Sequence, residues 1–209
     1  TKLDDGTSQA ILPTPAIGGV GLLEDWEKSA TIGFKAEGET ILVIGGTVGH
    51  LGQSLWLSEI HARRDGPPPP ADLIEERANG EFVRALVSAG LVTAVHDVSD
   101  GGLAVAVAEM ALAGGLGARI AAAVDGCPTA AMAFGEDQGR YVVTTRDPDA
   151  ILARAGRADR FAAPIGVTGG ESIIGRLDQG PEWRVALADL CAAHEGFFPN
   201  LMGAEGVLA

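Results

Sequence analysis

The sequence predicts a layered domain in which a β-sheet is covered by helices on its faces. Strand-like runs and helix-like stretches alternate along most of the 209 residues, which is typical of such a layered arrangement. Hydrophobic residues make up 46% of the chain and charged residues 21%, so the composition is that of an ordinary globular protein. Aromatic residues are only 5%, so the core has to be built mainly from aliphatic side chains.

The strand predictions depend on short apolar runs that are rich in β-branched residues. The clearest are ILVI, at the centre of residues 39–44, and RYVVTT at residues 140–145. The predicted strands are residues 39–44, 93–98, 118–124, 140–145, 163–167, 171–176 and 183–185. The 30 glycines are about twice the usual share and predict many tight turns between these elements.

The helix predictions depend on capping residues and glycines at the expected ends. Ser54 is placed to cap a short helix that ends near His61, and Gly90 is placed to end the next helix. The helix over residues 101–113 is apolar nearly all round, so we expect it to be central and buried. The predicted helices are residues 54–61, 72–89, 101–113, 129–133, 149–155 and 187–193.

Residues 1–36 do not form an obvious free-standing unit. The sequence LPTP at residues 12–15 has to be extended, because each proline biases the preceding residue away from helix. The apolar run AIGGVGLL at residues 16–23 predicts a buried strand that another part of the protein should cover. We therefore expect the first 36 residues to be poorly ordered or to pair with a neighbouring molecule.

Charge and cysteine content exclude several classes of protein. A net charge of −13 argues against general nucleic-acid binding and against a polybasic membrane contact, since both need a basic surface. The most apolar stretch, residues 101–124, contains charged residues and a glycine pair, so it does not predict a membrane span. Cys127 and Cys191 show no zinc-site spacing and are predicted to be free thiols in a reducing cytoplasm.

The strongest candidate site is the stretch HDVSDGGL at residues 96–103. A strand is predicted to end here, and two glycines open a helix whose first backbone amides lack partners within the helix. Such a helix start favours phosphate, and Asp97 at the strand end is placed to hold Mg²⁺. The alternative is a plain helix start capped by Ser99 or Asp100, and local physics slightly favours that alternative.

The second candidate is FGEDQGR at residues 134–140, a polar group between glycines that precedes a strand. The amide of Gln138 can donate and accept hydrogen bonds, and the carboxylates of Glu136 and Asp137 can hold sugar hydroxyls or a metal. The alternative, which spacing alone favours, is a polar turn in which Arg140 pairs with an acid.

Other polar features carry weaker signals. The glycine-rich loop at residues 45–54 lacks the lysine of a P-loop and fails the GxGxxG pattern, so a turn that tolerates close packing is the better prediction. His50, His61 and His194 show no metal-ligand spacing, and no nucleophile–base pair is readable.

Together, the stretches at residues 96–103 and 134–140 resemble those of the synthetase subunit of phosphoribosylformylglycinamidine synthase, from purine biosynthesis. The sequences PTPAIGGVGL at residues 13–22 and LGQS at residues 51–54 are also similar to that family. The resemblance therefore covers nearly the whole chain. The sequence departs from the family at Gln53, Leu55 and Trp56, and at residues 192–195 near its C-terminal end.

The resemblance implies an α+β fold, a layered α/β/α domain with a mixed sheet, as in the C-terminal domain of aminoimidazole ribonucleotide synthetase. It implies that residues 1–36 are the incomplete end of a second small sheet domain and that residues 37–209 are the second large α/β domain. In this family the catalytic histidine belongs to the other half of a pseudo-dimeric chain. No catalytic residue is therefore expected here, and the isolated piece is expected to be inactive.

The resemblance also implies the chemistry of the complete enzyme. ATP and Mg²⁺ would serve to phosphorylate an amide oxygen of formylglycinamide ribonucleotide, and ammonia from a glutaminase would displace the phosphate. The implied auxiliary site has Asp97 as its metal ligand. Its nucleotide-binding residues would be Ser99, Gly101, Gly102, Glu136, Asp137 and Gln138. The implied partners are the glutaminase subunit, a small bridging subunit and the N-terminal remainder of the same chain, in the cytoplasm.

Two other interpretations stay open. One is a related enzyme of the same superfamily, such as selenophosphate synthetase or thiamine-phosphate kinase, although the motif at residues 134–140 argues against it. The other is a non-catalytic structural module that completes an interface and at most holds a nucleotide. For the isolated piece we favour this structural interpretation, while the complete chain is expected to be the enzyme.

Overall fold

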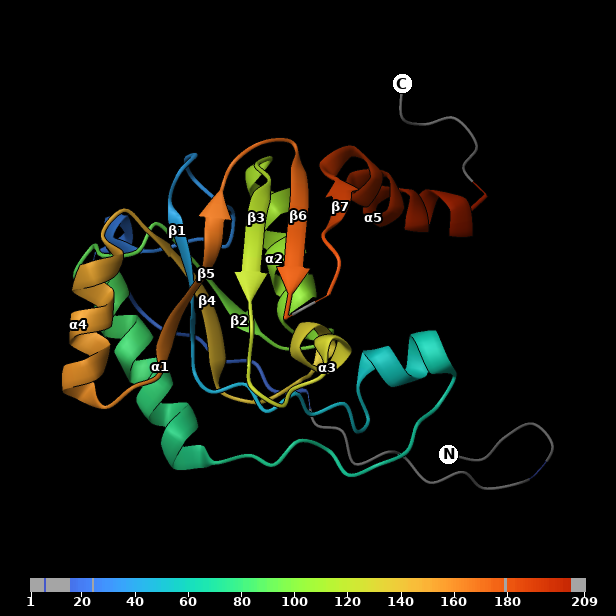
Figure 1. Ribbon diagram of the computed structural model, residues 1–209, viewed down its shortest axis with the longest axis horizontal. Coiled ribbons are helices and arrows are strands. Elements are labelled where there is room, and N and C mark those ends of the chain that lie inside the picture. The colour runs from blue at the N-terminus through green and yellow to red at the C-terminus, as the bar shows by residue number, and fades with distance from the viewer. Residues whose placement is uncertain (1–5, 7–15, 24, 179, 204–209) are drawn as a thin grey trace.

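A computed structural model describes residues 6, 16–23, 25–178 and 180–203, and within them a seven-stranded sheet forms the centre of the fold (Figure 1). The strands are β1 (Thr40–Ile44), β2 (Ala94–Val98), β3 (Ala118–Ala122), β4 (Arg140–Thr145), β5 (Ala162–Thr168), β6 (Ser172–Leu177) and β7 (Trp183–Ala186). Their order across the sheet is β2-β4-β1-β5-β3-β6-β7. All neighbours pair antiparallel except β3 and β6, which are parallel, so the prediction of a mixed sheet is confirmed.

Helices cover both faces of this sheet, which confirms the layered α/β/α arrangement. They are α1 (Leu73–Ser88), α2 (Gly102–Gly114), α3 (Thr129–Phe134), α4 (Pro148–Ala158) and α5 (Leu187–Leu201), with a 3-10 helix η1 (Trp26–Lys28) and a π-helix η2 (Trp56–Ile60). α1 and α4 lie on one side, while α3 and α5 lie on the other (Figure 1). The six predicted helices are present, but α5 is longer than expected and the helix after Ser54 is a π-helix.

The central strand β1 has a hydrophobic core on each of its faces. Ile41 and Val43 pack in the cluster that includes α2 and α3, while Leu42 and Ile44 pack in the cluster that includes α1 and α4. Side chains alternate between the two faces of a strand, so a strand covered on both faces needs apolar residues at every position. This explains the uninterrupted run ILVI in the sequence.

Residues 16–23 do not form the buried strand that the sequence predicts. They belong to no strand of the sheet, and the side chains of Ile17 and Leu22 are 89% and 96% exposed. An apolar run becomes a strand only when a sheet edge receives it, and the described sheet does not pair with this run. The predicted extended stretch at residues 12–15 lies outside the described residues.

The chain joins the folded body a little further on. Thr31 forms an isolated parallel bridge with Ala94, at the start of the edge strand β2. Phe34 is buried in the core, and its backbone amide donates to the carbonyl oxygen of Met110 in α2 at 3.1 Å. The domain division after residue 36 stays a prediction.

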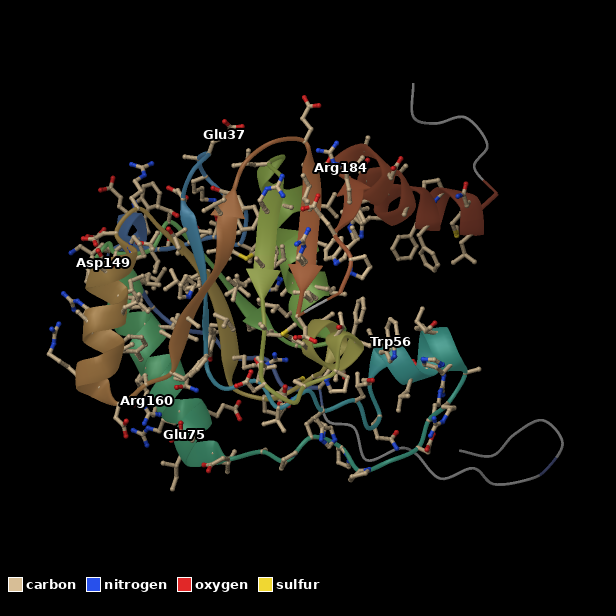
Figure 2. All side chains as sticks on the ribbon, viewed as in Figure 1. Glu37, Trp56, Glu75, Asp149, Arg160 and Arg184 are labelled. Atoms are coloured by element: carbon tan, nitrogen blue, oxygen red, sulfur yellow. The ribbon has the colours of Figure 1, made fainter. Side chains whose placement is uncertain are left out.

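The helices α1 and α4 are tied together by an ion pair at one end of their shared layer. Arg160, just beyond α4, lies with its Nη1 2.6 Å from Oε2 of Glu75 in α1 (Figure 2).

None of the described helices is long and apolar enough to cross a membrane.

Candidate functional site

Three segments that the sequence analysis singled out meet at one end of the sheet. Residues 45–55 follow β1, residues 99–102 follow β2, and residues 134–139 lead into β4. Because β4 runs antiparallel to both β1 and β2, its start lies beside their ends. We call these three segments the loop cluster.

Asp137 holds the glycine-rich segment of the loop cluster in place. Its Oδ2 accepts hydrogen bonds from the backbone amides of Val48 at 3.1 Å and Gly49 at 2.9 Å, and its Oδ1 accepts one from His50 at 3.1 Å. Successive amides that converge in this way form an anion-binding nest, and here a buried carboxylate of the same chain fills it. The loop is therefore a closely packed turn, as predicted, and not a phosphate loop.

Arg140 lies beneath the same loop, and its side chain is completely buried. Its Nη2 is 3.7 Å from Oδ2 of Asp137, its Nε donates to the carbonyl oxygen of Asp137 at 3.2 Å, and its Nη1 donates to Oγ1 of Thr47 at 3.2 Å. Burial lowers the pKa of the Arg140 guanidinium, and the negative charge of Asp137 opposes that change. The predicted alternative, in which Arg140 pairs with an acid, is what the structure shows.

Glu136 connects the starts of two helices. Its Oε1 accepts hydrogen bonds from the backbone amide of Gly101, which precedes α2, at 2.9 Å and from that of Leu55, which precedes η2, at 2.8 Å. Its own amide donates to the carbonyl oxygen of His50 at 2.9 Å. A helix start favours negative charge, so this carboxylate occupies the position where the sequence predicted a phosphate.

The expectation that Ser99 or Asp100 caps α2 is wrong. Both residues are exposed, and neither side chain caps the helix. Ser99 contributes its carbonyl oxygen, which accepts from the amide of Gly102 at 3.1 Å. A Cβ atom on Gly102 would lie 2.6 Å from the carbonyl oxygen of Gly135, so glycine is needed for close approach of two segments. Because Glu136 arrives from a distant part of the sequence, local reasoning could not identify it as the partner of this helix start.

Gln138 and Asp97 lie at the exposed rim of this region. The Nε2 of Gln138 donates to the carbonyl oxygen of Glu136 at 3.2 Å. The side chain of Asp97 is 65% exposed, and its Oδ1 lies 3.1 Å from Nδ1 of His96, whose Nε2 lies 2.8 Å from Oε2 of Glu109. Gln138 therefore bonds within the loop cluster, whereas the contact described for Asp97 is with His96, its neighbour in β2.

Asp97 lies beside Tyr141, its pairing partner across β2 and β4. Tyr141 packs with the core on the α1 side of the sheet. Burial, and then the negative charges of Glu76 and Asp97, raise the pKa of Tyr141. Among the described residues, no group of three or more histidine, cysteine, aspartate or glutamate side chains is arranged to hold a metal ion. The structure therefore groups Glu136 with Asp137 but gives Asp97 no further protein ligands for a metal.

A large apolar groove, with a volume of about 610 Å³, was not predicted from the sequence, and it lies on the face of the sheet that α2 and α3 cover. Its lining includes Trp56 of η2, Trp183 of β7 and Leu190 of α5. The signal was present in α2, whose sequence is apolar nearly all round. The prediction that α2 is central and buried is confirmed for most of the helix, while Ala104 and Ala108 line this groove and are partly buried.

Residues 36–178 match the family described as AIR synthase related protein, C-terminal domain, and the chain belongs to this family. It is 49% identical over 203 residues to phosphoribosylformylglycinamidine synthase subunit PurL of Zymomonas mobilis. It is 50% identical over 209 residues to the same subunit of Parvibaculum lavamentivorans. These matches cover 97% and 98% of this chain but only 27% and 28% of the relatives, so the chain spans little more than a quarter of their length.

Solved structures show the same fold at lower sequence identity. Thermotoga maritima PurL complexed with FGAR is similar with a TM-score of 0.65 at 20% identity, covering 79% of this chain and 30% of that one. T. maritima PurL complexed with ATP is similar with a TM-score of 0.62 at 18% identity, covering 78% and 27%. These likenesses support the α+β assignment and the mixed sheet.

Proposed function

We propose that this chain is the C-terminal part of the synthetase subunit of phosphoribosylformylglycinamidine synthase, a ligase of purine biosynthesis. The observation that carries the proposal is the 49% to 50% identity to PurL subunits over nearly the whole of this chain. The complete enzyme would convert formylglycinamide ribonucleotide to formylglycinamidine ribonucleotide with ATP and glutamine-derived ammonia. The T. maritima relatives bound to ATP and to FGAR support this choice of substrates.

In this reaction the amide oxygen of the substrate attacks the γ-phosphorus of ATP, and ADP leaves. Ammonia then adds to the activated carbon, and expulsion of inorganic phosphate leaves the amidine. Such chemistry needs positioned phosphates and neutralised charge more than a covalent nucleophile. The described residues supply a scaffold of backbone amides and carboxylates, and we assign no catalytic residue to this part of the chain.

Mg²⁺ fits this chain only in part. Magnesium is commonly held by one or two carboxylates together with substrate phosphates, and Asp97 is exposed enough to supply one such ligand. No complete set of protein ligands exists among the described residues, so no step is derived through the metal.

The auxiliary nucleotide site is proposed at the start of α2. Ser99 and Gln138 are exposed there and would contact the nucleotide, and the backbone of Gly101 and Gly102 would lie beneath it. Glu136 and Asp137 would build the wall of the site, because their carboxylates are already bonded to backbone amides.

A structural module without nucleotide is the second candidate for this part of the protein. One observation favours it: the Gly101 amide that a phosphate would use already donates to Glu136 at 2.9 Å. A nucleotide at this position would have to displace that carboxylate.

The partners of the complete protein follow from the same proposal. A PurLQS structure from T. maritima has been solved, which supports assembly of the full-length subunit with other subunits. We propose a glutaminase and a small bridging subunit as these partners, and the cytoplasm as the place of action.

Turnover assays test the main proposal. Full-length protein is expected to form the amidine from ATP, Mg²⁺, formylglycinamide ribonucleotide and ammonium, whereas the 209-residue chain is expected to form none. Turnover by the 209-residue chain, or none by the full-length protein, would contradict this.

Nucleotide titration tests the auxiliary site. Asp97→Asn is expected to weaken Mg²⁺-dependent ATP binding, whereas Asp125→Asn, a change at another exposed aspartate, is expected to leave it unchanged. Absence of binding would favour the structural module. Binding that is equal without metal would show that Asp97 is not a metal ligand.

A further inference from the structure

The helices α1 and α4 cover only part of their face of the sheet. Within the described residues, the core beneath them contains side chains of β1, β2, β4 and the start of β5, but none of β3, β6 or β7. Figure 1 shows α2 behind β3 and β6 and no helix in front of them. A sheet face that carries apolar residues is normally buried against another element. We call the uncovered part, formed by β3, β6, β7 and the end of β5, the open face.

The strand register places one row of side chains across the open face. Arg119 of β3 pairs with Val167 of β5 on one side and with Ile174 of β6 on the other. Ile174 pairs in turn with Arg184 of β7 (Figure 2). Side chains alternate between the faces of a strand, and Ile120, the neighbour of Arg119, lies in the core on the α2 side. The row therefore lies on the opposite face, where arginines alternate with aliphatic residues.

The open face is basic, although the chain has a net charge of −13. Arg176, which pairs with Ala121, shares the face with Arg119 and Arg184, and all three arginines are exposed. The Nη1 of Arg119 lies 3.1 Å from Oε2 of Glu182. Arg176 and Arg184 take part in none of the ion pairs found within the part of the chain that the structure describes. This face therefore has positive charge that the described chain does not neutralise.

The side chains of the open face fit a protein better than a nucleic acid. Sheet faces that bind single-stranded nucleic acid present aromatic side chains on which the bases stack. The row across the open face has aliphatic side chains, Val167 and Ile174, between its arginines. Arginine is enriched at protein interfaces, where its stem packs on apolar groups and its guanidinium pairs with carboxylates. The contact between Arg119 and Glu182 shows that a carboxylate is accommodated here.

A helix is the element that the rest of this face already accepts. The helices α1 and α4 cover the neighbouring strands on the same face (Figure 1). An amphipathic helix can present an aliphatic stripe with acidic residues beside it, three and four positions apart. A second copy of this chain in a symmetric, face-to-face contact would instead set arginine against arginine, because both copies use the same surface.

We propose that the open face docks an acidic amphipathic helix of another protein. Aliphatic side chains of that helix lie on Val167 and Ile174, and its carboxylates pair with Arg176 and Arg184. The open face lies apart from the loop cluster, so the proposal does not depend on the proposed function.

Fluorescence anisotropy with the full-length protein tests the docking. The probe is a labelled, hydrocarbon-stapled helix of about 18 residues, roughly 27 Å long, with a leucine stripe flanked by glutamates. The control peptide has lysine in place of every glutamate. We expect the acidic peptide to bind about tenfold more tightly than the lysine peptide, and salt to weaken its binding.

Charge reversal locates the binding surface. Arg184→Glu is expected to weaken binding of the acidic peptide by about tenfold and to strengthen binding of the lysine peptide. Arg176→Glu gives the same test if Arg184→Glu fails to fold. Arg157→Glu, at an exposed arginine of α4, is the matched control and should change binding by less than about twofold.

Four results would overturn the proposal. They are no binding of the acidic peptide, equal binding of the two peptides, an equal loss in Arg157→Glu, and tighter binding of a poly-deoxythymidine oligonucleotide. Phenylglyoxal labelling of Arg184 tests access to the face. We expect it to be labelled in the full-length protein, and protection there would mean that the protein's own chain covers the face, which would also overturn the proposal.

Discussion

The loop cluster and the apolar groove differ in how completely the described chain meets their needs. The buried polar side chains of the loop cluster all find hydrogen-bond partners, whereas apolar side chains beside the groove stay exposed. In the loop cluster, two carboxylates receive five backbone amides, and the buried guanidinium of Arg140 has carbonyl, hydroxyl and carboxylate partners. Among the described residues, no buried side-chain nitrogen or oxygen lacks a hydrogen-bond partner. On α5, by contrast, whose Leu190 lines the groove, large apolar side chains such as Phe198 are exposed to solvent.

This difference indicates that the two regions depend on different parts of the protein. Buried polar groups have to be paired within the fold, because an unmade hydrogen bond there costs about 1–3 kcal/mol. Apolar surface has no such local requirement and can stay exposed until another part of the protein or another molecule covers it. Substitutions in the loop cluster should therefore affect this chain by itself, whereas substitutions on α5 should matter mainly in the longer protein.

Asp137→Ala is expected to have the largest effect on stability. It removes the acceptor of three loop amides and leaves Arg140 buried without its charge partner, which should lower the free energy of unfolding by roughly 3–5 kcal/mol. Urea unfolding measures the change. Asp125→Ala, at an exposed site, is the control and should stay within about 0.5 kcal/mol of the parent. A small effect of Asp137→Ala would mean that the loop is not held by this carboxylate.

Gly49→Ala should have the next largest effect. A Cβ atom there would lie 2.6 Å from Sγ of Cys127, and the φ of 83° disfavours any side chain. We expect a loss of roughly 1–3 kcal/mol in unfolding free energy. Gly46→Ala in the same loop has nothing within 4 Å of its new Cβ and should be nearly neutral. Equal effects of the two variants would contradict close packing of the loop.

Glu136 variants test the connection between α2 and η2. Glu136→Ala leaves the amides of Gly101 and Leu55 without their acceptor. It should lower the free energy of unfolding by about 1–3 kcal/mol, and by less if water replaces the carboxylate. Glu136→Gln keeps an oxygen acceptor and should lose less than half of that amount. Hydrogen exchange at the first turn of α2 provides a local measurement. An unchanged exchange rate in Glu136→Ala would show that this cap is unimportant.

The two cysteines give the smallest effect, a difference in thiol labelling. Burial, and then the charge of Asp137, raise the pKa of Cys127, whose Sγ lies 3.7 Å from the carbonyl oxygen of Val48 in the loop cluster. A hydrogen bond with Glu195 is the main cause of the raised pKa of Cys191 on α5. Both thiols should therefore label faster as pH rises above their ordinary pKa, and at any one pH exposure should make Cys191 react ~10-fold faster.

Unfolding should equalise the two labelling rates. Faster labelling of Cys127 than of Cys191 in the native chain would contradict the burial of Cys127.

Most of the sheet and its helices could be predicted because local patterns mark them. The strand at ILVI, the helix α1 and the end of α2 at its glycines could be predicted because each signal lies in neighbouring residues. The strand predicted at residues 16–23 failed because a strand also needs a partner edge, which no local pattern reports. In the candidate site, Glu136 and Asp137 were found by residue type, but their roles depend on amides 35 to 89 positions away.

By itself, the sequence determined the layered class of fold, the order of its elements, the mixed sheet through the resemblance, and the family. Periodicity, capping and motif identity are properties of short segments, and these can be read along the chain. The tertiary structure decided that Glu136 is the acceptor at the start of α2, that Asp97 lies beside Tyr141, and that an apolar groove lies between α2 and α5. Those outcomes depend on contacts between distant segments, because burial and hydrogen-bond satisfaction are settled only when the layers pack together.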